Sequence, residues 1–391
     1  MQDVIPFQKK HSQYFRTVRD INLEQPVTFR VQIIRVRCPS CKKPFPLPPP
    51  ITISSHARTT NRSRDLALTL IVKVNGSLQS SGEVTRDITH LNLPRTTLHD
   101  WKQSAAGNVS HREIIKQLQF SGVLCVDECR PLCSDTFNLF ATDRLKGRIL
   151  YLEETEDRYA ISGNTAERFF LDLKALSIHP KAIIADMSGG IHAGAQRIFP
   201  HAHYQYDYFH VIQSVHEKLK KEIRSFWWQL RKQRRTKEAA LLWEAQWTLL
   251  RNQESWDAED EQRWKAVYTL FPNTIIARLP AFKQELRDIF DQSKSIEEAK
   301  KKRDEWIAHW RSSLVGTRYL NQIVKLMQSP FFLLMVTYLD QRWIPRTTNA
   351  ETLIRNYRKM EKTRYGFGSI GGRRNHLKLF QLKTYLAQKV G

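Results

Sequence analysis

The chain has 391 residues, of which 41% are hydrophobic, and its 62 Lys and Arg against 39 Asp and Glu give a net charge of +23. Such a surplus favours a polyanionic partner, because each basic group that meets a phosphate releases a condensed counterion. Five cysteines, an odd number, argue against a disulfide scaffold. The sequence offers no signal segment and no run of about 18 apolar residues, so we expect an intracellular protein without a membrane partner.

Residues 1–50 are expected to form a small β-rich module. Val27–Arg37 alternates apolar and polar side chains, which is the pattern of a half-buried strand. Cys38 and Cys41 follow as a Cys-x-x-Cys pair, which supplies two of the four ligands of a structural zinc site. Zn²⁺ is therefore a candidate cofactor of this module, at a degenerate site for which the pair supplies only two ligands.

Residues 51–108 predict a helix-turn-helix unit. Its third helix, Arg95–Gln103, follows Pro94, which presets the backbone for a helix start. Leu98 and Trp101 share the i, i+3 spacing of a buried face. The polar residues of this helix are expected to face outward and contact DNA: Arg95, Thr96, Thr97, His99 and Lys102. An ordinary three-helix packing module is the alternative.

Residues 109–216 predict the first part of a ribonuclease-H-like α/β core. Apolar runs between turns predict strands at 123–127, 137–142, 149–152, 182–186 and 203–209. Amphipathic periodicity predicts helices at 164–176 and 188–199. Three strands close in sequence favour an antiparallel meander, and the later alternation of strand and helix favours parallel additions to the same sheet.

Residues 217–340 predict an all-α block, since helix-forming side chains dominate and Pro is scarce. Eight of the ten Trp residues lie between Trp227 and Trp310. We interpret them as the aromatic core of a helical bundle, and the alternative is a surface on which nucleic-acid bases stack.

Residues 341–391 are expected to complete the catalytic core. Asn349 and Ala350 open a helix that carries Glu351 in its first turn, and a Gly-rich stretch at 365–372 follows. Glycines beside arginines permit the backbone to approach phosphates closely, or they form an ordinary loop. The basic residues expected to contact DNA are Arg355, Arg358, Lys359, Lys362, Arg364, Arg373 and Arg374.

Two carboxylates end apolar strands of the predicted sheet. Asp127 ends the first strand and Asp186 ends the fourth. Carboxylates that meet at adjacent strand ends need a cation between them, and oxygen ligands without a histidine cluster suit Mg²⁺ or Mn²⁺. Glu351 is the candidate third ligand. These three residues predict a two-metal site that cleaves and rejoins phosphodiesters.

Asp207 and His210 lie at the end of the fifth predicted strand. Asp207 is a rival third ligand, although a supporting or structural role is favoured. His210 is interpreted as a hydrogen-bonded core histidine rather than a metal ligand. Glu128 follows Asp127 on a strand, so its side chain is expected to face the opposite side of the sheet.

Several motifs, taken in order, resemble the ISL3-type transposases of bacterial insertion sequences. They are Arg37–Cys41, Asp127 with Glu128, Ala185–Met187, Phe199 with Pro200, Asp207–Val211, Asn349–Glu351 and Tyr365–Phe367. The resemblance implies a zinc module, a helix-turn-helix, and a DDE catalytic domain interrupted by a helical insertion. It maps the catalytic triad onto Asp127, Asp186 and Glu351. The chain departs from the family pattern because no second cysteine pair precedes Cys38.

The same resemblance implies the partners of the protein. They are double-stranded DNA, as terminal inverted repeats and as target, and a second copy of the chain in a homodimer, in the cytoplasm of a bacterium. Two other hypotheses remain open. One is a catalytically silent, sequence-specific DNA-binding regulator derived from a transposase. The other is a nuclease of the same fold that acts on RNA–DNA hybrids or junctions.

Overall fold

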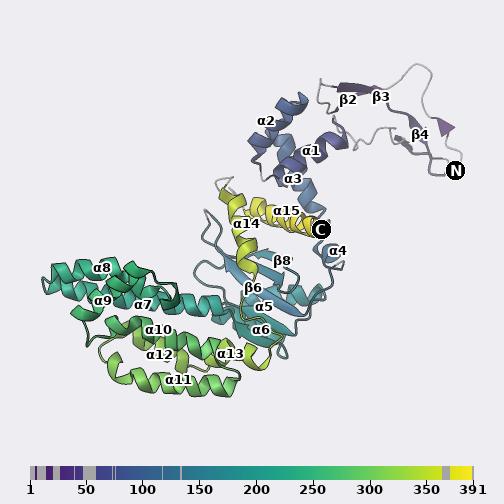
Figure 1. Ribbon diagram of the computed structural model, residues 1–391. Coiled ribbons are helices and arrows are strands. Elements are labelled where there is room, and N and C mark those ends of the chain that lie inside the picture. Colours follow the sequence, from purple (N-terminus) through teal and green to yellow (C-terminus); the bar gives the residue numbers. More distant parts are fainter. Residues whose placement is uncertain are drawn as a thin grey trace.

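In the computed structural model, a central five-stranded sheet lies between a long helical block and a smaller N-terminal region (Figure 1). The structure describes residues 5–6, 15–20, 27–38, 40–46, 59–72, 74, 76–116, 118–132, 134–362 and 370–389. The last two helices lie on the side of the sheet that faces the N-terminal helices (Figure 1).

Short strands make up the described part of the N-terminal region. β2 (Phe15–Asp20) pairs antiparallel with β3 (Val27–Gln32), and β4 (Arg35–Arg37) pairs with both β1 (Ile5–Pro6) and β5 (Pro44–Pro46). The single strand that the alternating pattern predicted is therefore two strands, β3 and β4, which pair in different sheets.

Four helices follow: α1 (Asn61–Val72), α2 (Leu78–Thr89), α3 (Arg95–Gly107) and the short α4 (His111–Lys116). Apolar side chains of α1 and α3 share a small buried cluster. The Ser77 hydroxyl caps α2 by accepting a hydrogen bond from the Ser80 N–H. Val84 and Ile88 of α2 are 38% and 46% exposed, so the apolar face of this helix lies at the surface.

The central sheet contains β6 (Val123–Cys129), β7 (Asn138–Asp143), β8 (Arg148–Glu154), β9 (Ala182–Ala185) and β10 (His203–Tyr206). Their order is β10-β9-β6-β7-β8, with β6 to β8 antiparallel and with β9 and β10 added in parallel to β6. Helix α5 (Gly163–Ala175) precedes β9 and α6 (Gly189–Ile198) follows it. The predicted order of strands and helices is confirmed. However, β10 ends at Tyr206 because Asp207 caps a helix there.

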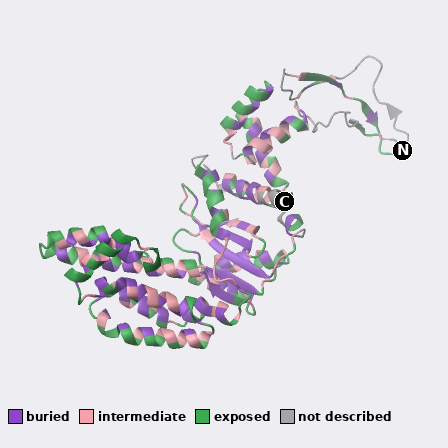
Figure 2. Cartoon of the chain, in the orientation of Figure 1, coloured by how far each residue is buried: buried purple, intermediate pink, exposed green. Residues whose placement is uncertain are grey.

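Different helices cover the two faces of the sheet. Leu124 and Val126 of β6 pack with apolar residues of α5 and α6. Cys129 and Phe140 pack instead against α14 (Ala350–Lys362) and α15 (Ile370–Lys389). Figure 2 shows the sheet as the buried centre of this region. The alternation of side chains along β6 therefore sends successive residues toward different helices.

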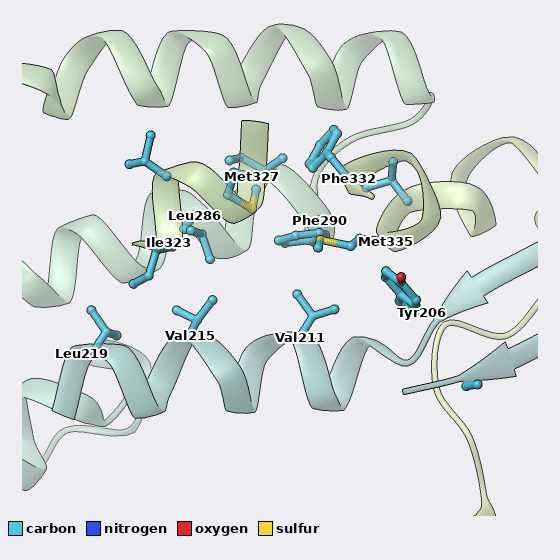
Figure 3. Close-up of a cluster of buried hydrophobic side chains, with 14 of the residues drawn as sticks. Tyr206, Val211, Val215, Leu219, Leu286, Phe290, Ile323, Met327, Phe332 and Met335 are labelled. Carbon is cyan, nitrogen blue, oxygen red and sulfur yellow. The ribbon is translucent and has the colours of Figure 1, made fainter. Parts of the chain in front are cut away.

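The helical block contains α7 (Tyr208–Lys232), α8 (Thr236–Leu250), α9 (Ala258–Leu270), α10 (Ile275–Asp291), α11 (Ile296–Trp310), α12 (Arg318–Gln328) and α13 (Phe332–Asp340). α7 begins at the sheet and continues into the block, so the domain boundary expected at residue 216 falls inside this helix. Figure 3 shows Val211, Val215 and Leu219 of α7 pointing toward a cluster formed by α10, α12 and α13. One hydrophobic core therefore runs from the sheet into the block.

No single helix in the described part of the chain is long and apolar enough to cross a membrane. Only α12 and α13 taken together, bent by 51° at their junction, reach that length and composition.

α15 corrects the interpretation of the Gly-rich stretch. The helix begins at Ile370, so Gly371, Gly372, Arg373 and Arg374 are helical rather than part of a loop. Arg364 and the rest of that stretch lie outside the described residues.

Candidate active site

Asp127 and Asp186 occupy neighbouring positions on the two central strands. Val126 of β6 pairs in parallel register with Ala185 of β9, and the next residue on each segment is one of the two acids. Asp186 directly follows its strand, as predicted. Asp127 lies inside β6 rather than at its end, because the strand continues to Cys129. The register therefore brings together the two acids that the sequence singled out.

Burial makes ionisation of both acids costly. Asp127 is only 7% exposed. Burial raises its pKa to about 6, with the charge of Asp186 adding to the effect and that of His210 opposing it. Burial also raises the pKa of Asp186. Each carboxylate accepts one backbone hydrogen bond through Oδ1, from the Glu128 N–H at 2.8 Å and from the Ser188 N–H at 3.0 Å respectively.

The chemistry of these residues fits a hard divalent cation. Asp127 and Asp186 both provide carboxylate oxygens, which are the ligands that Mg²⁺ and Mn²⁺ prefer. The negative charge of Asp207 also raises the pKa of Asp127. A bound cation would offset this accumulation of negative charge.

Asp207 and His210 lie at the start of α7, beside the two acids. Asp207 Oδ1 accepts the Phe209 N–H at 2.9 Å, and its Oδ2 accepts hydrogen bonds from the Thr348 N–H and Oγ1 at 3.2 and 2.8 Å. Because both oxygens bind protein groups, Asp207 has the contacts of a structural carboxylate. His210 is half-buried and lines a pocket rather than lying in the core as expected.

Glu351 is exposed in the first turn of α14. The start of this helix is anchored to the sheet, since Asn349 Oδ1 accepts the Thr142 hydroxyl at 3.2 Å and Asn349 Nδ2 donates to the Arg144 carbonyl at 3.1 Å. Within the described ranges, no group of three or more Asp, Glu, His or Cys side chains is close enough to hold a metal ion. The role of Glu351 as third ligand therefore stays a prediction.

A pocket of about 580 Å³ opens beside Asp186 and His210, and Glu128 lines it. Burial, followed by the charges of Asp186 and Asp127, raises the pKa of Glu128 to about 7. Its Oε2 is buried and has no hydrogen-bond partner among the described residues. Strand alternation alone gave no reason to place Glu128 at the site, because the pocket is formed by α6 and α7, which the strand pattern does not reveal.

A comparison with known protein families agrees with this geometry. The model of the ISL3-type DDE transposase family, described as a transposase, matches residues 124–370, which include all of the sheet except Val123, the helical block and α14. The chain belongs to the ISL3-type DDE transposases. The protein is therefore an enzyme of DNA transposition that binds DNA, in a class that uses divalent metal ions. No curated protein sequence matches the chain.

On α3 of the transposase, most residues predicted to contact DNA lie at the surface. Those that are exposed or half-buried are Arg95, Thr96, Thr97 and His99. Lys102 does not face outward as expected, because this residue is only 7% exposed. It lies one turn after the buried Leu98 and so shares its face, and α3 packs against α15.

The basic residues of α14 are all at the surface of the transposase: Arg355, Arg358, Lys359 and Lys362. Arg358 Nε donates a hydrogen bond to Cys129 Sγ at 3.2 Å. The hydrogen bond to Cys129 is the main cause that raises the pKa of Arg358, and the charge of Asp127 adds to it. Arg358 therefore places a positive charge within electrostatic range of the candidate active site.

The arginines of α15 differ from each other. Arg373 is only 7% exposed, and its Nε donates to Glu154 Oε1 at 2.6 Å, so its guanidinium is held in a buried ion pair and its contact with DNA stays a prediction. A guanidinium can be buried in this way because a buried carboxylate pairs with it. Arg374 is exposed and lines a second pocket together with Glu153.

Cys38 and Cys41 lie at the turn between β4 and β5. The Cys38 N–H donates to the Lys43 carbonyl and the Lys42 N–H donates to the Cys38 carbonyl, both at 2.9 Å. Hydrogen bonds from the backbone of Cys41 and Ser40 lower the pKa of the Cys38 thiol. In the described part of the transposase no further Cys or His completes a metal-binding group with this pair, so zinc is not supported.

The raised pKa of Asp127 predicts a pH-dependent gain in stability when the charge is removed. In the metal-free folded protein, burial favours the neutral form of the Asp127 carboxyl. The contribution of this neutral carboxyl to folding stability is therefore fully present below about pH 4 and is lost as the pH rises through about 6. Asp127→Asn stays neutral and is expected to unfold roughly 2–6 °C above wild type at pH 7.5 in EDTA.

Thermal unfolding in EDTA between pH 4 and pH 8 measures this difference. The difference in unfolding temperature between Asp127→Asn and wild type should disappear toward pH 4. At pH 7.5, Mg²⁺ should reduce this difference by stabilising wild type alone. A gap that is independent of pH, or a variant that is less stable at pH 7.5, would contradict the electrostatic explanation.

Proposed function

We propose that this transposase binds the terminal inverted repeats of an insertion sequence and catalyses metal-dependent strand cleavage and strand transfer. The observation that carries the proposal is the parallel register of β6 and β9, which places the buried Asp127 beside Asp186. Family membership supports DNA as the substrate.

In this proposal Asp127, Asp186 and Glu351 hold two Mg²⁺ or Mn²⁺ ions. Bound ions of this kind activate an attacking water or 3′-hydroxyl and stabilise the leaving oxygen. Asp127 and Asp186 contribute oxygens from adjacent strands, while Glu351 reaches the site by rotation of its exposed side chain. The hydrogen bonds of Asp207 to Thr348 hold the segment before α14 and so position Glu351.

We place the DNA contacts on two elements. α3 would enter the major groove of a terminal repeat with its surface residues Arg95, Thr96, Thr97 and His99. The basic side chains of α14 would hold phosphates near the carboxylates. Strand transfer joins two DNA ends to one target, so we expect the protein to act as a homodimer.

The test uses labelled duplexes that carry the ends of the element, taken from the DNA that flanks its gene, beside scrambled duplexes of equal composition. Wild type is expected to bind the ends at least about 100-fold more tightly and to cut at the element boundary in Mg²⁺ or Mn²⁺ but not in EDTA. Specific binding without cleavage would favour the silent regulator. Preferred cleavage of RNA–DNA hybrids or junctions would favour a nuclease.

A further inference from the structure

α7 carries a continuous exposed stripe that begins at the candidate active site. Val211, Val215 and Leu219 bury one face of this helix against the helical block (Figure 3). The exposed residues on the other side recur every three or four positions: Gln213, Glu217, Lys221, Arg224 and Trp228. This spacing forms one stripe along the helix, and from Gln213 to Trp228 it extends about 22 Å.

The near end of the stripe reaches the carboxylates. Gln213 and Lys221 line the same pocket as Asp186. Lys218 also lines this pocket, where its Nζ donates to Ser214 Oγ at 2.6 Å. The stripe therefore passes the pocket that Asp186 lines, where Lys218 and Lys221 can bind phosphate. The stripe carries one carboxylate, that of Glu217, which opposes phosphate binding locally.

The far end of the stripe is aromatic. Trp228 is 54% exposed, and its ring centroid lies 4.7 Å from that of Trp227, which is 5.4 Å from that of Trp243. Trp247 is 60% exposed, with the Lys220 ammonium 5.5 Å from its ring centroid. Trp228 on α7 and Trp247 on α8 are therefore two exposed indoles along the stripe, and Trp247 has a cation over its face.

Two other tryptophans of the block have a different environment. Trp306 and Trp310 are 3% and 2% exposed. Their indole nitrogens donate hydrogen bonds to the Phe282 carbonyl at 3.2 Å and to Glu285 Oε2 at 2.8 Å. The expected aromatic core therefore accounts for part of the Trp-rich region only, and packing does not explain the exposed group.

A cavity of about 350 Å³ lies beside Trp247. Trp247 and Lys220 line it together with His216, Glu217, Leu250 and Arg251. An open cavity with one indole wall and flanking cations is suited to a planar, unsaturated ring attached to an anionic backbone.

We propose that the stripe on α7 and the exposed tryptophans beside it bind an unpaired DNA strand that leads away from the carboxylates. Lys218, Lys221 and Arg224 would contact phosphates, while bases stack on Trp228 and Trp247. Single-stranded DNA is favoured over a duplex because paired bases expose only their edges, whereas unpaired bases expose the faces that indoles stack on. The proposal rests on the proposed function, since transposition generates unpaired strands at cut ends.

The test measures binding of a fluorescent oligo-dT of about 12 nucleotides, and of a duplex of equal length, in EDTA. Protein carrying Asp186→Asn serves as the background, so neither cleavage nor metal binding is required. On this background, Trp228→Ala with Trp247→Ala is expected to weaken single-strand binding about tenfold or more and duplex binding less than twofold. Trp228→Phe with Trp247→Phe should restore most of the affinity, because Phe also stacks.

Trp343→Ala is the matched control. Trp343 is 45% exposed but lies outside the block, where its Nε1 donates to Gln341 Oε1 at 3.0 Å, so its replacement should leave both affinities unchanged. Unchanged single-strand binding in the Trp228 and Trp247 double variant would overturn the proposal. Equal loss of both affinities would overturn it in favour of a general phosphate-binding face. A change of oligomeric state with unchanged DNA binding would overturn it in favour of a contact between copies.

Discussion

Replacing Asp186 by Asn is expected to lower the rate of end cleavage in Mg²⁺ by at least about 1000-fold. Asn keeps the size of the side chain and can still accept the Ser188 N–H hydrogen bond at Oδ1, but it removes the negative charge. A metal ion supplies several kcal/mol of transition-state charge stabilisation in such sites, and loss of a ligand forfeits much of it. Asp127→Asn is expected to have the same effect. Gel assays of labelled end duplexes measure both rates.

Two further variants define what these losses mean. Glu351→Gln is expected to lower the rate to a similar degree if Glu351 reaches the ions when DNA is bound. Asp172→Asn is the control. The Asp172 carboxylate lies on α5, away from the acids, and accepts a hydrogen bond of 3.1 Å from the Tyr151 hydroxyl. The cleavage rate of this variant should change less than twofold. Cleavage that survives Asp186→Asn would remove Asp186 from the catalytic machinery.

The second large effect concerns the packing of α6. Gly190→Ala is expected to destabilise the protein by roughly 3 kcal/mol or more. A Cβ at this position would lie 1.9 Å from the Ile161 carbonyl oxygen and 2.8 Å from its carbon, and backbone atoms cannot rotate away. α6 would have to move, and with it the Ser188 N–H that holds Asp186. Thermal and urea unfolding measure the loss.

The neighbouring glycine provides the control. A Cβ at Gly189 would have no heavy atom within 4 Å, and the residue is in the first turn of the same helix. Gly189→Ala should therefore leave stability unchanged or raise it by up to about 1 kcal/mol, because Ala has less freedom to lose on folding. Equal destabilisation by both changes would show that the contact with Ile161 is not the cause.

The sequence predicted the sheet well for a physical reason. Strands buried on both faces are continuous apolar runs, and the runs that end near Asp127 and Asp186 stand out for this reason. The end of β10 was harder to predict. Tyr208 and Phe209 continue its apolar pattern, but the Asp207 carboxylate caps a helix at that point.

Contacts between distant segments explain the environments that the sequence patterns did not reveal. Arg373 looked like a phosphate contact beside glycines, and only the fold shows that it pairs with Glu154. Lys102 was expected to be exposed, but it is buried on a helix that packs against both α1 and α15. Glu128 lines a pocket with Asp186 that α6 and α7 help to form, and strand alternation alone does not reveal this pocket. A sequence pattern reports the environment of its own segment, and these three environments are made by other segments.

The continuity between sheet and helical block has a functional consequence. α7 is a single helix of 25 residues that starts at the Asp207 cap and carries both the pocket lysines and Trp228. A helix of this length extends about 37 Å. A strand bound on its exposed side would therefore be held at a fixed position relative to the carboxylates, without a flexible connection between them.

The most direct test of the central claim, that Asp186 contacts a catalytic cation, is a change of metal preference. Asp186→Cys replaces a carboxylate by a thiolate, which is a poor ligand for Mg²⁺ and a better one for Mn²⁺. We predict that end cleavage by this variant is lost in Mg²⁺ and recovers at least tenfold in Mn²⁺, relative to wild type measured in the same two metals. Equal activity of the variant in both metals, whether high or absent, would contradict direct contact between Asp186 and the cation.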